Sequence, residues 1–269
     1  MKSNQKILII FAFLLSSSFI VGDGGYRSAK NNKFQRGEFL TYLVHYSFVN
    51  AGEATVFMDK DLHTINNRAC YKVDIVGRSI GMLSMTYKIN DLWQSFIDTG
   101  AIIPQKFHRN IQENNYRKKE TVIFDHLKKT SVLTHKTFDD PEVKKEYPIP
   151  MNVQDMVSGY YYLRTLDFAN LKVGDTLSVD GYLEGQIYDF KIRFVGREKL
   201  RTEFGKIRTA IISPILPETQ LFKGRDALKV WISDDENRVP IKIQAELFVG
   251  AIELDLIDHK GLRSKFKKD

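Results

Sequence analysis

The sequence contains few residues whose types and spacing point to metal or cofactor chemistry. None of its six histidines lies in a His-Glu-x-x-His motif, and none pairs with a cysteine at the spacing of a metal site. These histidines are His45, His63, His108, His126, His135 and His259. We therefore predict no metal ion and no cofactor.

The stretch SDDEN, Ser233–Asn237, places three carboxylates together. A calcium loop would need about twelve residues with a central glycine and a terminal glutamate, and this pattern is missing. Because aspartate and asparagine also form turns through bonds to their own backbone, we predict a hairpin turn here. The chain has no Gly-x-Ser-x-Gly motif and no glycine-rich phosphate loop. Side chains from distant segments could still assemble a hydrolase site, which sequence order cannot reveal.

Cys70 is the single cysteine of the chain. It cannot form an intramolecular disulfide, so stability in an oxidising compartment must come from the apolar core. Cys70 lies in ACYKVDIVG, where apolar and polar residues alternate as in a strand. We predict a buried, inert thiol.

Two tryptophans occupy similar surroundings in distant parts of the chain. LWQSFIDTGAIIPQKF, Leu92–Phe107, and KVWISDDENRVPIKIQ, Lys229–Gln244, both run from tryptophan through a polar turn to Pro-x-Lys. Trp231 follows Trp93 by 231 − 93 = 138 residues, and Pro240 follows Pro104 by 240 − 104 = 136 residues. This spacing predicts two related modules. The tryptophans either anchor the core beside their turns or form a ligand-facing pair, Trp93 and Trp231, at the mouth of a cleft.

Most segments that must position these residues alternate in the manner of half-buried strands. Phe39–Phe48 is expected to turn at NAGE, Asn50–Glu53, and return as a hairpin. A second hairpin is expected around Gly185. We predict a mainly β protein, in which two related antiparallel sheets form an open barrel or a sandwich.

One segment has helical periodicity, residues 152–166. Asn152 is expected to cap the helix, with Asp155 three residues later as a variant capping box. The apolar stripe at helical spacing is Val153, Met156, Val157, Tyr160 and Leu163. The helix is expected between the two modules, where Met156, Tyr160 and Leu163 would line or close a cleft. Tyr160, Tyr161 and Tyr162 cannot share one helical face, so at least one should touch a second surface or water.

The N-terminus has the pattern of a secretory signal. Lys2 and Lys6 precede the apolar stretch Ile7–Val21, and a helix over that stretch would be only about 22 Å long, shorter than the hydrocarbon core of a bilayer. We expect a signal peptide, 1–22, and export to the periplasm or cell envelope of a Gram-negative bacterium. No cysteine near Val21 offers a site for lipid attachment.

The remaining chain is expected to divide at changes in composition. The predicted units are a poorly ordered leader 23–36, a first β-module 37–138, a helical connector 139–173, a second β-module 174–258 and a basic tail 259–269. The formal net charge of +7 is spread along the chain, so no nucleic-acid partner is predicted. The basic patches YRKK, Tyr116–Lys119, and SKFKK, Ser264–Lys268, are either solvated surface or weak attractors of anionic lipid head groups.

Four stretches carry a family resemblance: GEFLTYLVHYSFVNAGEATV, DLWQSFIDTGAIIPQKFHRNI, NYRKKETVIFD and VWISDDENRVPIKIQAEL. They resemble the domain-of-unknown-function 3108 family of exported bacterial proteins, over residues 34–256. The resemblance implies an exported β-rich protein without an established activity. The hairpin from tryptophan to Pro-x-Lys also resembles one in periplasmic lipoprotein-carrier half-barrels, and it transfers no functional residue.

Three functional hypotheses follow. The first is a non-catalytic envelope module that binds a lipid or another apolar or amphiphilic ligand. The second is an assembly module that docks an envelope protein on exposed strand edges. The third is a hydrolase acting on an envelope polymer, which would need a convergent polar pocket.

Overall fold

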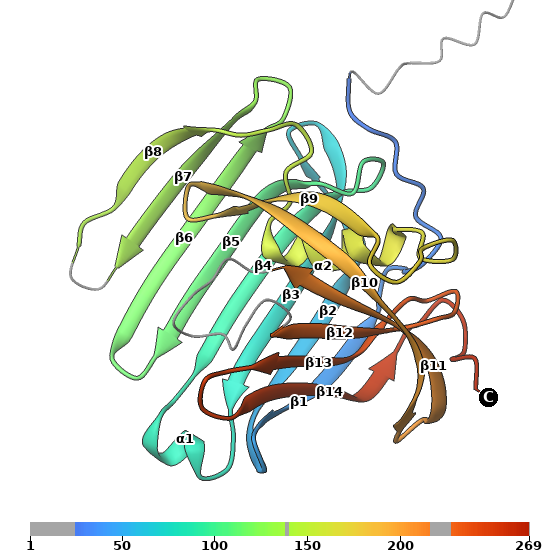
Figure 1. Ribbon diagram of the computed structural model, residues 1–269. Coiled ribbons are helices and arrows are strands. Elements are labelled where there is room, and N and C mark those ends of the chain that lie inside the picture. The colour runs from blue at the N-terminus through green and yellow to red at the C-terminus, as the bar shows by residue number, and fades with distance from the viewer. Residues whose placement is uncertain (1–24, 138–139, 216–226, 269) are drawn as a thin grey trace, which may run out of the picture.

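The computed structural model describes residues 25–137, 140–215 and 227–268. Within these residues, fourteen strands form one continuous antiparallel sheet, accompanied by two short helices (Figure 1). The mainly β prediction is therefore confirmed. The predicted signal peptide, residues 1–22, lies outside the described residues. Neither described helix is long and apolar enough to cross a bilayer.

The first part of the sheet is a meander of eight strands with one short helix inserted. Its elements are β1 (Phe39–Tyr46), β2 (Val49–Ile65), β3 (Arg68–Ser79), α1 (Leu83–Thr86), β4 (Asn90–Asp98), β5 (Pro104–Glu113), β6 (Tyr116–Asp125), β7 (Thr130–Thr137) and β8 (Val143–Pro148).

The second part begins with a helix and continues as a six-stranded meander. Its elements are α2 (Met156–Thr165), β9 (Thr176–Leu183), β10 (Gln186–Thr202), β11 (Gly205–Ile215), β12 (Leu228–Ser233), β13 (Pro240–Glu246) and β14 (Ala251–Lys260).

The two meanders are joined edge to edge by β1 and β14. These strands pair along the whole of β1, from Phe39 opposite Lys260 to Tyr46 opposite Ile252. Each strand of the sheet therefore has a partner on both sides except β8 and β9, which form its edges. The two predicted modules are thus parts of one curved sheet, which is the open-barrel alternative rather than the sandwich.

Several turns follow directly from residue type. Asn66 and Asn67 connect β2 to β3 with φ of 51° and 57°, and Glu184 and Gly185 connect β9 to β10 with φ of 52° and 80°. Two consecutive positive φ values match the twist of hairpin strands, and asparagine and glycine tolerate them best. The hairpin predicted around Gly185 is confirmed.

The first hairpin turns earlier than predicted. Asn50–Glu53 was expected as the turn, but these residues belong to β2, and Tyr46 lies opposite Val49. The connection is therefore Ser47 and Phe48, with Ser47 at a φ of 53°. The small residues at positions 50–52 suggested a turn there. Pairing along the entire strand sets the register instead, and it places the turn at Ser47 and Phe48.

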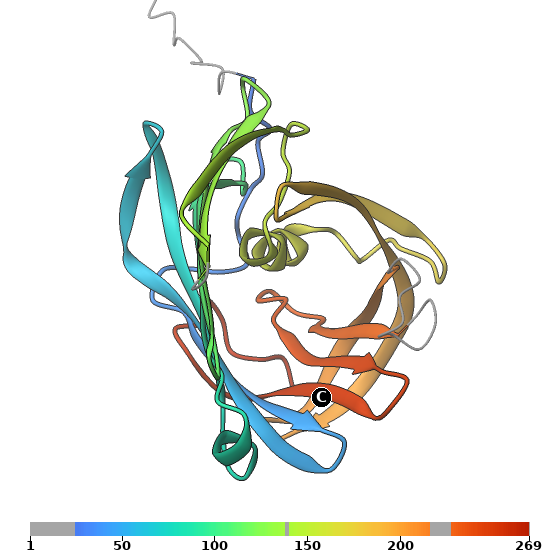
Figure 2. The same ribbon diagram turned by 90° about the vertical axis from the view of Figure 1, so that its left-hand side faces the viewer.

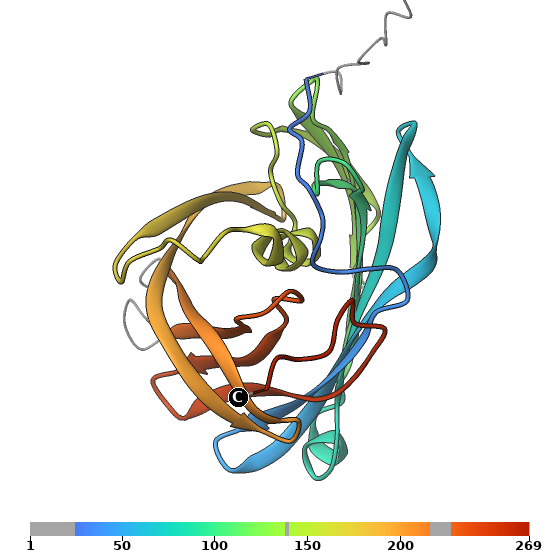
Figure 3. The ribbon, with the colours of Figure 1, turned by 90° about the vertical axis from the view of Figure 1, so that its right-hand side faces the viewer.

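The sheet curls so that its two ends approach each other, and α2 lies in the opening between them (Figures 2 and 3). The helix packs against β4 from the first meander and β9 from the second. A large apolar cluster on the concave side draws residues from both meanders, including Leu40, Phe107 and Leu256. A smaller cluster around Phe194, Ile212 and Val230 lies within the second meander. The concave side is therefore a packed core.

The tryptophans and prolines that suggested the repeat lie on strands that occupy the same position in the order of their meanders. Trp93 lies on β4 and Trp231 on β12, the fourth strand of each meander, while Pro104 and Pro240 begin the fifth. The second strands, β2 and β10, are both 17 residues long. This strand order agrees with a repeat, and the relationship between the two modules stays a prediction.

The segments that flank the sheet are held against it. Residues 25–36, expected as a poorly ordered leader, carry Phe34, which is buried, and Ala29, whose N–H donates to the Gly100 carbonyl at 2.8 Å. In the basic tail, the ring of Phe266 lies 4.8 Å from that of His259. Single aromatic side chains anchor both segments. The polar residues around them led us to expect a poorly ordered leader and a merely basic tail.

Candidate functional site

Helix α2 begins at a buried carboxylate. Asp155 Oδ1 accepts from the backbone N–H groups of Val157 at 2.8 Å and Ser158 at 2.7 Å, and Ser158 Oγ accepts from the Asp155 N–H at 3.0 Å. This is a reciprocal capping box, with Asp155 rather than the predicted Asn152 as the N-cap. Asn152 instead lies in the preceding loop at a φ of 65°.

The other oxygen of Asp155 contacts the sheet. Ser95 Oγ on β4 donates to Asp155 Oδ2 at 2.7 Å. Burial raises the pKa of Asp155 to about 6, although the hydrogen bonds from Ser158, Ser95 and Val157 oppose that shift. The cap therefore fixes the start of α2 to the first meander at the cost of a desolvated acid.

The C-terminal turn of α2 carries a fully buried ion pair. Arg164 Nη1 donates to Glu38 Oε1 at 2.5 Å, and Arg164 Nη2 donates to Glu38 Oε2 at 2.8 Å. Tyr161 Oη donates to Glu38 Oε1 at 3.1 Å, and Arg164 also donates to the Asn237 carbonyl. Burial alone would lower the pKa of Arg164, but the Glu38 carboxylate outweighs it and raises that pKa.

This pair bridges the two meanders. Glu38 immediately precedes β1, while Asn237 lies in the turn between β12 and β13. Both side chains of the pair are completely inaccessible to solvent. The network therefore ties α2 to both meanders through contacts that solvent does not reach.

The three adjacent tyrosines of α2 contact three different partners. Tyr160 Oη lies 2.8 Å from Tyr42 Oη, and Tyr42 Oη donates to the Pro240 carbonyl at 2.9 Å. Burial raises the pKa of Tyr160. The Arg27 guanidinium lies 3.8 Å from the centre of the Tyr162 ring. Together with Tyr161 on Glu38, these contacts show that the tyrosines do spread over separate surfaces.

The buried stripe of α2 differs from the predicted one. It consists of Val157, Ser158, Tyr161 and Arg164, whereas Met156, which the sequence places on one apolar stripe with Val157, is 52% exposed. Leu163 packs beside the smaller cluster, away from Tyr160 in the larger one. The stripe is rotated because Glu38 permits an arginine to be buried. Ligand binding by Met156, Tyr160 and Leu163 stays a prediction.

The two tryptophans leave opposite faces of the sheet. Trp93 alternates with Ser95, which contacts α2, so its side chain lies on the concave side, 6.1 Å from the Phe107 ring. Trp231 stands between Val230 and Ile232 of the smaller cluster, so its side chain points the other way. Its Nε1 donates to Glu198 Oε1. The structure does not bring Trp93 and Trp231 together, and their role toward a ligand stays a prediction.

A charged cluster that sequence reading missed ties the β9–β10 turn to the first meander. Arg109 Nη2 donates to Glu120 Oε2 at 2.9 Å and also contacts Glu184, and Lys118 Nζ donates to Glu184 Oε1 at 2.6 Å. A hydrogen bond from Lys118 lowers the pKa of Glu184. The four residues come from β5, β6 and a distant turn, so no sequence spacing could have revealed them.

A cavity lies where the β10–β11 turn approaches β1 and β14. It has a volume of about 480 Å³. Its apolar lining residues are Leu43, Leu200, Ile241, Leu256 and Ile257. Its polar lining residues are His45, Arg201, Thr202, Glu203 and Asp255. None of these residues was a sequence-based candidate, because four separate segments contribute them.

The remaining sequence candidates behave as structural groups. Cys70 is buried, as predicted, and burial raises the pKa of its thiol to about 12. Asp235 accepts from the N–H groups of Asn237 at 2.9 Å and Arg238 at 3.2 Å, which forms the predicted turn in SDDEN. Among residues 25–137, 140–215 and 227–268, no group of three or more His, Cys, Asp or Glu is placed to hold a metal.

Comparisons with known proteins address the family and the fold. The family model "Protein of unknown function (DUF3108)" matches residues 41–257, as the resemblance predicted. A β-barrel-like protein of Brucella abortus from domain-of-unknown-function family DUF1849 is similar in structure, with a TM-score of 0.53 and 7% identity over 86% of this chain and 100% of that one. At that identity the likeness shows the fold alone. A "putative lipoprotein" from Parabacteroides distasonis aligns at a TM-score of 0.36 and 13% identity, over 87% of this chain and 100% of its own. No curated protein matches the sequence.

Proposed function

The chain belongs to the DUF3108 family, and we propose that it is an exported, non-catalytic module that binds an amphiphilic ligand. The export part rests on Lys2, Lys6 and the apolar stretch Ile7–Val21. Cell fractionation combined with N-terminal sequencing tests it, since export predicts a chain that lacks these residues.

The cavity between β1, β14 and the β10–β11 turn carries the binding part of the proposal. Small-molecule sites are about 300–1,000 Å³ in volume and combine an apolar lining with a few polar groups. The cavity, at about 480 Å³, falls within this range. Its apolar lining residues could hold an acyl chain or a ring system.

The polar wall determines which head group fits. Arg201 and Glu203 carry opposite charges, and His45 Nε2 lies 3.5 Å from Asp255 Oδ2. Lys242 Nζ lies 3.9 Å from Asp255 Oδ1 and already balances part of its charge. Because both signs are present, an uncharged or zwitterionic head group suits the cavity better than a strongly charged one.

A binding assay that compares the wild type with a variant whose cavity is filled by a larger side chain tests this proposal. The methyl ester of a dansyl-labelled fatty acid, which has an uncharged head group, serves as the probe, and native mass spectrometry detects a molecule that co-purifies. Leu43→Trp adds bulk to the lining and should weaken probe binding at least about tenfold. Leu62→Trp, on an exposed part of β2, is the matched control and should bind normally. Equal binding by wild type and Leu43→Trp would rule the cavity out.

Docking through strand edges, the second hypothesis, has weaker support. Edge strand β8 exposes Lys144, Lys145 and Glu146, and such charges oppose the addition of another strand. The other edge, β9, is partly occupied because Gln154 pairs with it: Gln154 N–H donates to the Asp180 carbonyl at 2.8 Å. We therefore favour ligand binding in the cavity over docking through strand edges.

A further inference from the structure

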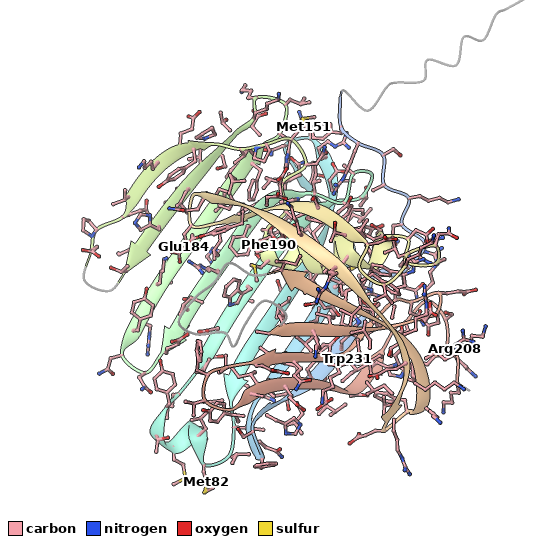
Figure 4. All side chains as sticks on the ribbon, in the orientation of Figure 1. Met82, Met151, Glu184, Phe190, Arg208 and Trp231 are labelled. Carbon is pink, nitrogen blue, oxygen red and sulfur yellow. The ribbon has the colours of Figure 1, made fainter. Side chains whose placement is uncertain are left out.

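Three neighbouring turns at one end of the sheet expose large apolar side chains. We call these six residues the apolar rim: Phe48 and Val49 after β1, Met82 and Met85 at α1, and Phe248 and Val249 between β13 and β14. Phe48 is 102% exposed, Met85 84% and Val249 76%. The turns lie together at the lower left of Figure 1, and Figure 4 labels Met82 at that extremity.

Backbone contacts make the apolar rim continuous. The Ser47 N–H donates to the Ala251 carbonyl at 2.8 Å, and Tyr46 Oη donates to the Val249 carbonyl at 3.0 Å. On the other side, the Ile80 N–H donates to the Ala51 carbonyl at 3.0 Å. The three turns are thus adjacent parts of one edge rather than separate exposed residues.

The turns that form the apolar rim carry no charge. Residues 46–52, 79–87 and 247–252 contain no Asp, Glu, Lys or Arg. Three acids directly adjoin these segments: Glu53, Glu246 and Glu253. Glu53 Oε1 lies 2.6 Å from Arg78 Nη2, and Glu253 Oε2 lies 2.5 Å from Lys242 Nζ. A contiguous exposed apolar surface of this kind normally marks a contact with a protein or a membrane.

Exposed cations stand beside the apolar rim. Lys88 follows α1, and its carbonyl accepts from the Asn114 N–H at 2.8 Å, which places the β5–β6 turn next to it. That turn leads into YRKK, in which Arg117 and Lys119 are exposed. Glu113, an acid beside these cations, accepts from Tyr87 Oη at 2.9 Å.

Exposed tyrosines directly precede two of these cations in the chain: Tyr87 precedes Lys88, and Tyr116 precedes Arg117. Tyr87 is 39% exposed and Tyr116 is 51% exposed. Tyrosine is enriched at membrane–water interfaces, because its ring is apolar and its hydroxyl is polar. Apolar tips, tyrosines and cations correspond to the layers of a bilayer surface: acyl chains, interface and anionic head groups.

We propose that the apolar rim docks onto a lipid bilayer that contains anionic lipids. Phe48, Met85 and Phe248 enter the boundary between head groups and acyl chains, while Lys88, Arg117 and Lys119 contact lipid phosphates. Side chains that protrude from three different turns suit a fluid surface, which adapts to each turn, better than a rigid protein face. This docking is independent of the cavity and its ligand.

Vesicle co-sedimentation tests the proposal. The chain used begins at Gly25, which removes the apolar stretch Ile7–Val21 and retains every residue of both apolar clusters, from Phe34 to Phe266. Phosphatidylcholine vesicles are compared with vesicles of phosphatidylcholine and phosphatidylglycerol at about three to one. The wild-type chain should bind the mixed vesicles more strongly, and binding should weaken as salt screens the lysines and arginine.

Two sets of variants separate the apolar and the charged contributions. Phe48→Ser with Phe248→Ser should lower the partition constant at least about tenfold on both vesicle types. The triple variant Lys88→Gln/Arg117→Gln/Lys119→Gln should remove only the preference for phosphatidylglycerol. Leu127→Ser, in the β6–β7 turn, is the matched control: Leu127 is 51% exposed, and its substitution should change nothing.

A fluorescence experiment reports position directly. Phe248→Trp should show a blue shift when mixed vesicles are added, and Leu127→Trp should not. Absence of binding by the wild-type chain, or equal binding by the wild type and the Phe48→Ser/Phe248→Ser variant, would overturn the proposal. So would light scattering that shows a wild-type dimer dissociated by those two substitutions, because the apolar rim would then be a contact between copies.

Discussion

Charged side chains usually lie on the surface of a protein and apolar ones inside it, but the centre of this molecule and its apolar rim show the reverse. In the centre, Glu38 and Arg164 are charged and completely buried. On the apolar rim, Phe48 and Val249 are apolar and almost fully exposed. The charges in the centre have partners within the chain, namely each other, Tyr161 and Asn237. The exposed apolar side chains have no comparable partners. We therefore assign the buried ion pair to folding and the apolar rim to contact with another surface.

The largest effect should come from breaking the buried ion pair. Glu38→Ala leaves Arg164 buried without its carboxylate, and such a loss costs about 3–5 kcal/mol of unfolding free energy. Urea denaturation measures this change. The double variant Glu38→Met/Arg164→Met removes both charges, so it should regain much of the loss. A cost below about 1 kcal/mol for Glu38→Ala would mean that the pair does not hold α2 in place.

A smaller effect should appear in the pH dependence of stability, through Asp155. Because its pKa is raised from 3.8 to about 6, the folded state holds a proton that the unfolded state has released between these values. The contribution of Asp155 is therefore complete below about pH 4 and is lost as pH rises through about 6, by about 2–3 kcal/mol.

Comparison with Asp155→Asn isolates this contribution, because carboxylates with lowered pKa values, such as Asp98 and Glu184, produce the opposite trend. Unfolding free energies measured from pH 4 to pH 7 should fall less steeply with pH in the variant than in the wild type. Parallel curves for the two chains would show that the acid titrates normally.

The smallest effect on stability should come from the apolar rim. Phe48→Ser changes a side chain that has no cover in the folded state, so the unfolding free energy should move by no more than about 0.5 kcal/mol. Thermal and urea unfolding measure it, with Leu127→Ser as the matched control. A loss above about 2 kcal/mol would assign Phe48 to the fold and blur the contrast with the buried pair.

Local pattern was sufficient for much of the architecture. Alternating residues predicted the strands, Gly185 marked its hairpin, and SDDEN predicted a turn that Asp235 builds. The helix between the modules was also predicted, although α1 was not. These features depend on residues within a few positions of one another, where periodicity and turn chemistry act directly.

The tertiary structure alone decided the rest, because the contacts involved span large distances along the chain. Glu38 meets Arg164 across 126 residues, which rotates the buried face of α2 and exposes Met156. Pairing of β1 with β14 merges two expected sheets into one. The same pairing brings the turn that carries Phe48 beside the turn that carries Phe248, so an apolar rim arises from turns that look unremarkable when each is taken singly.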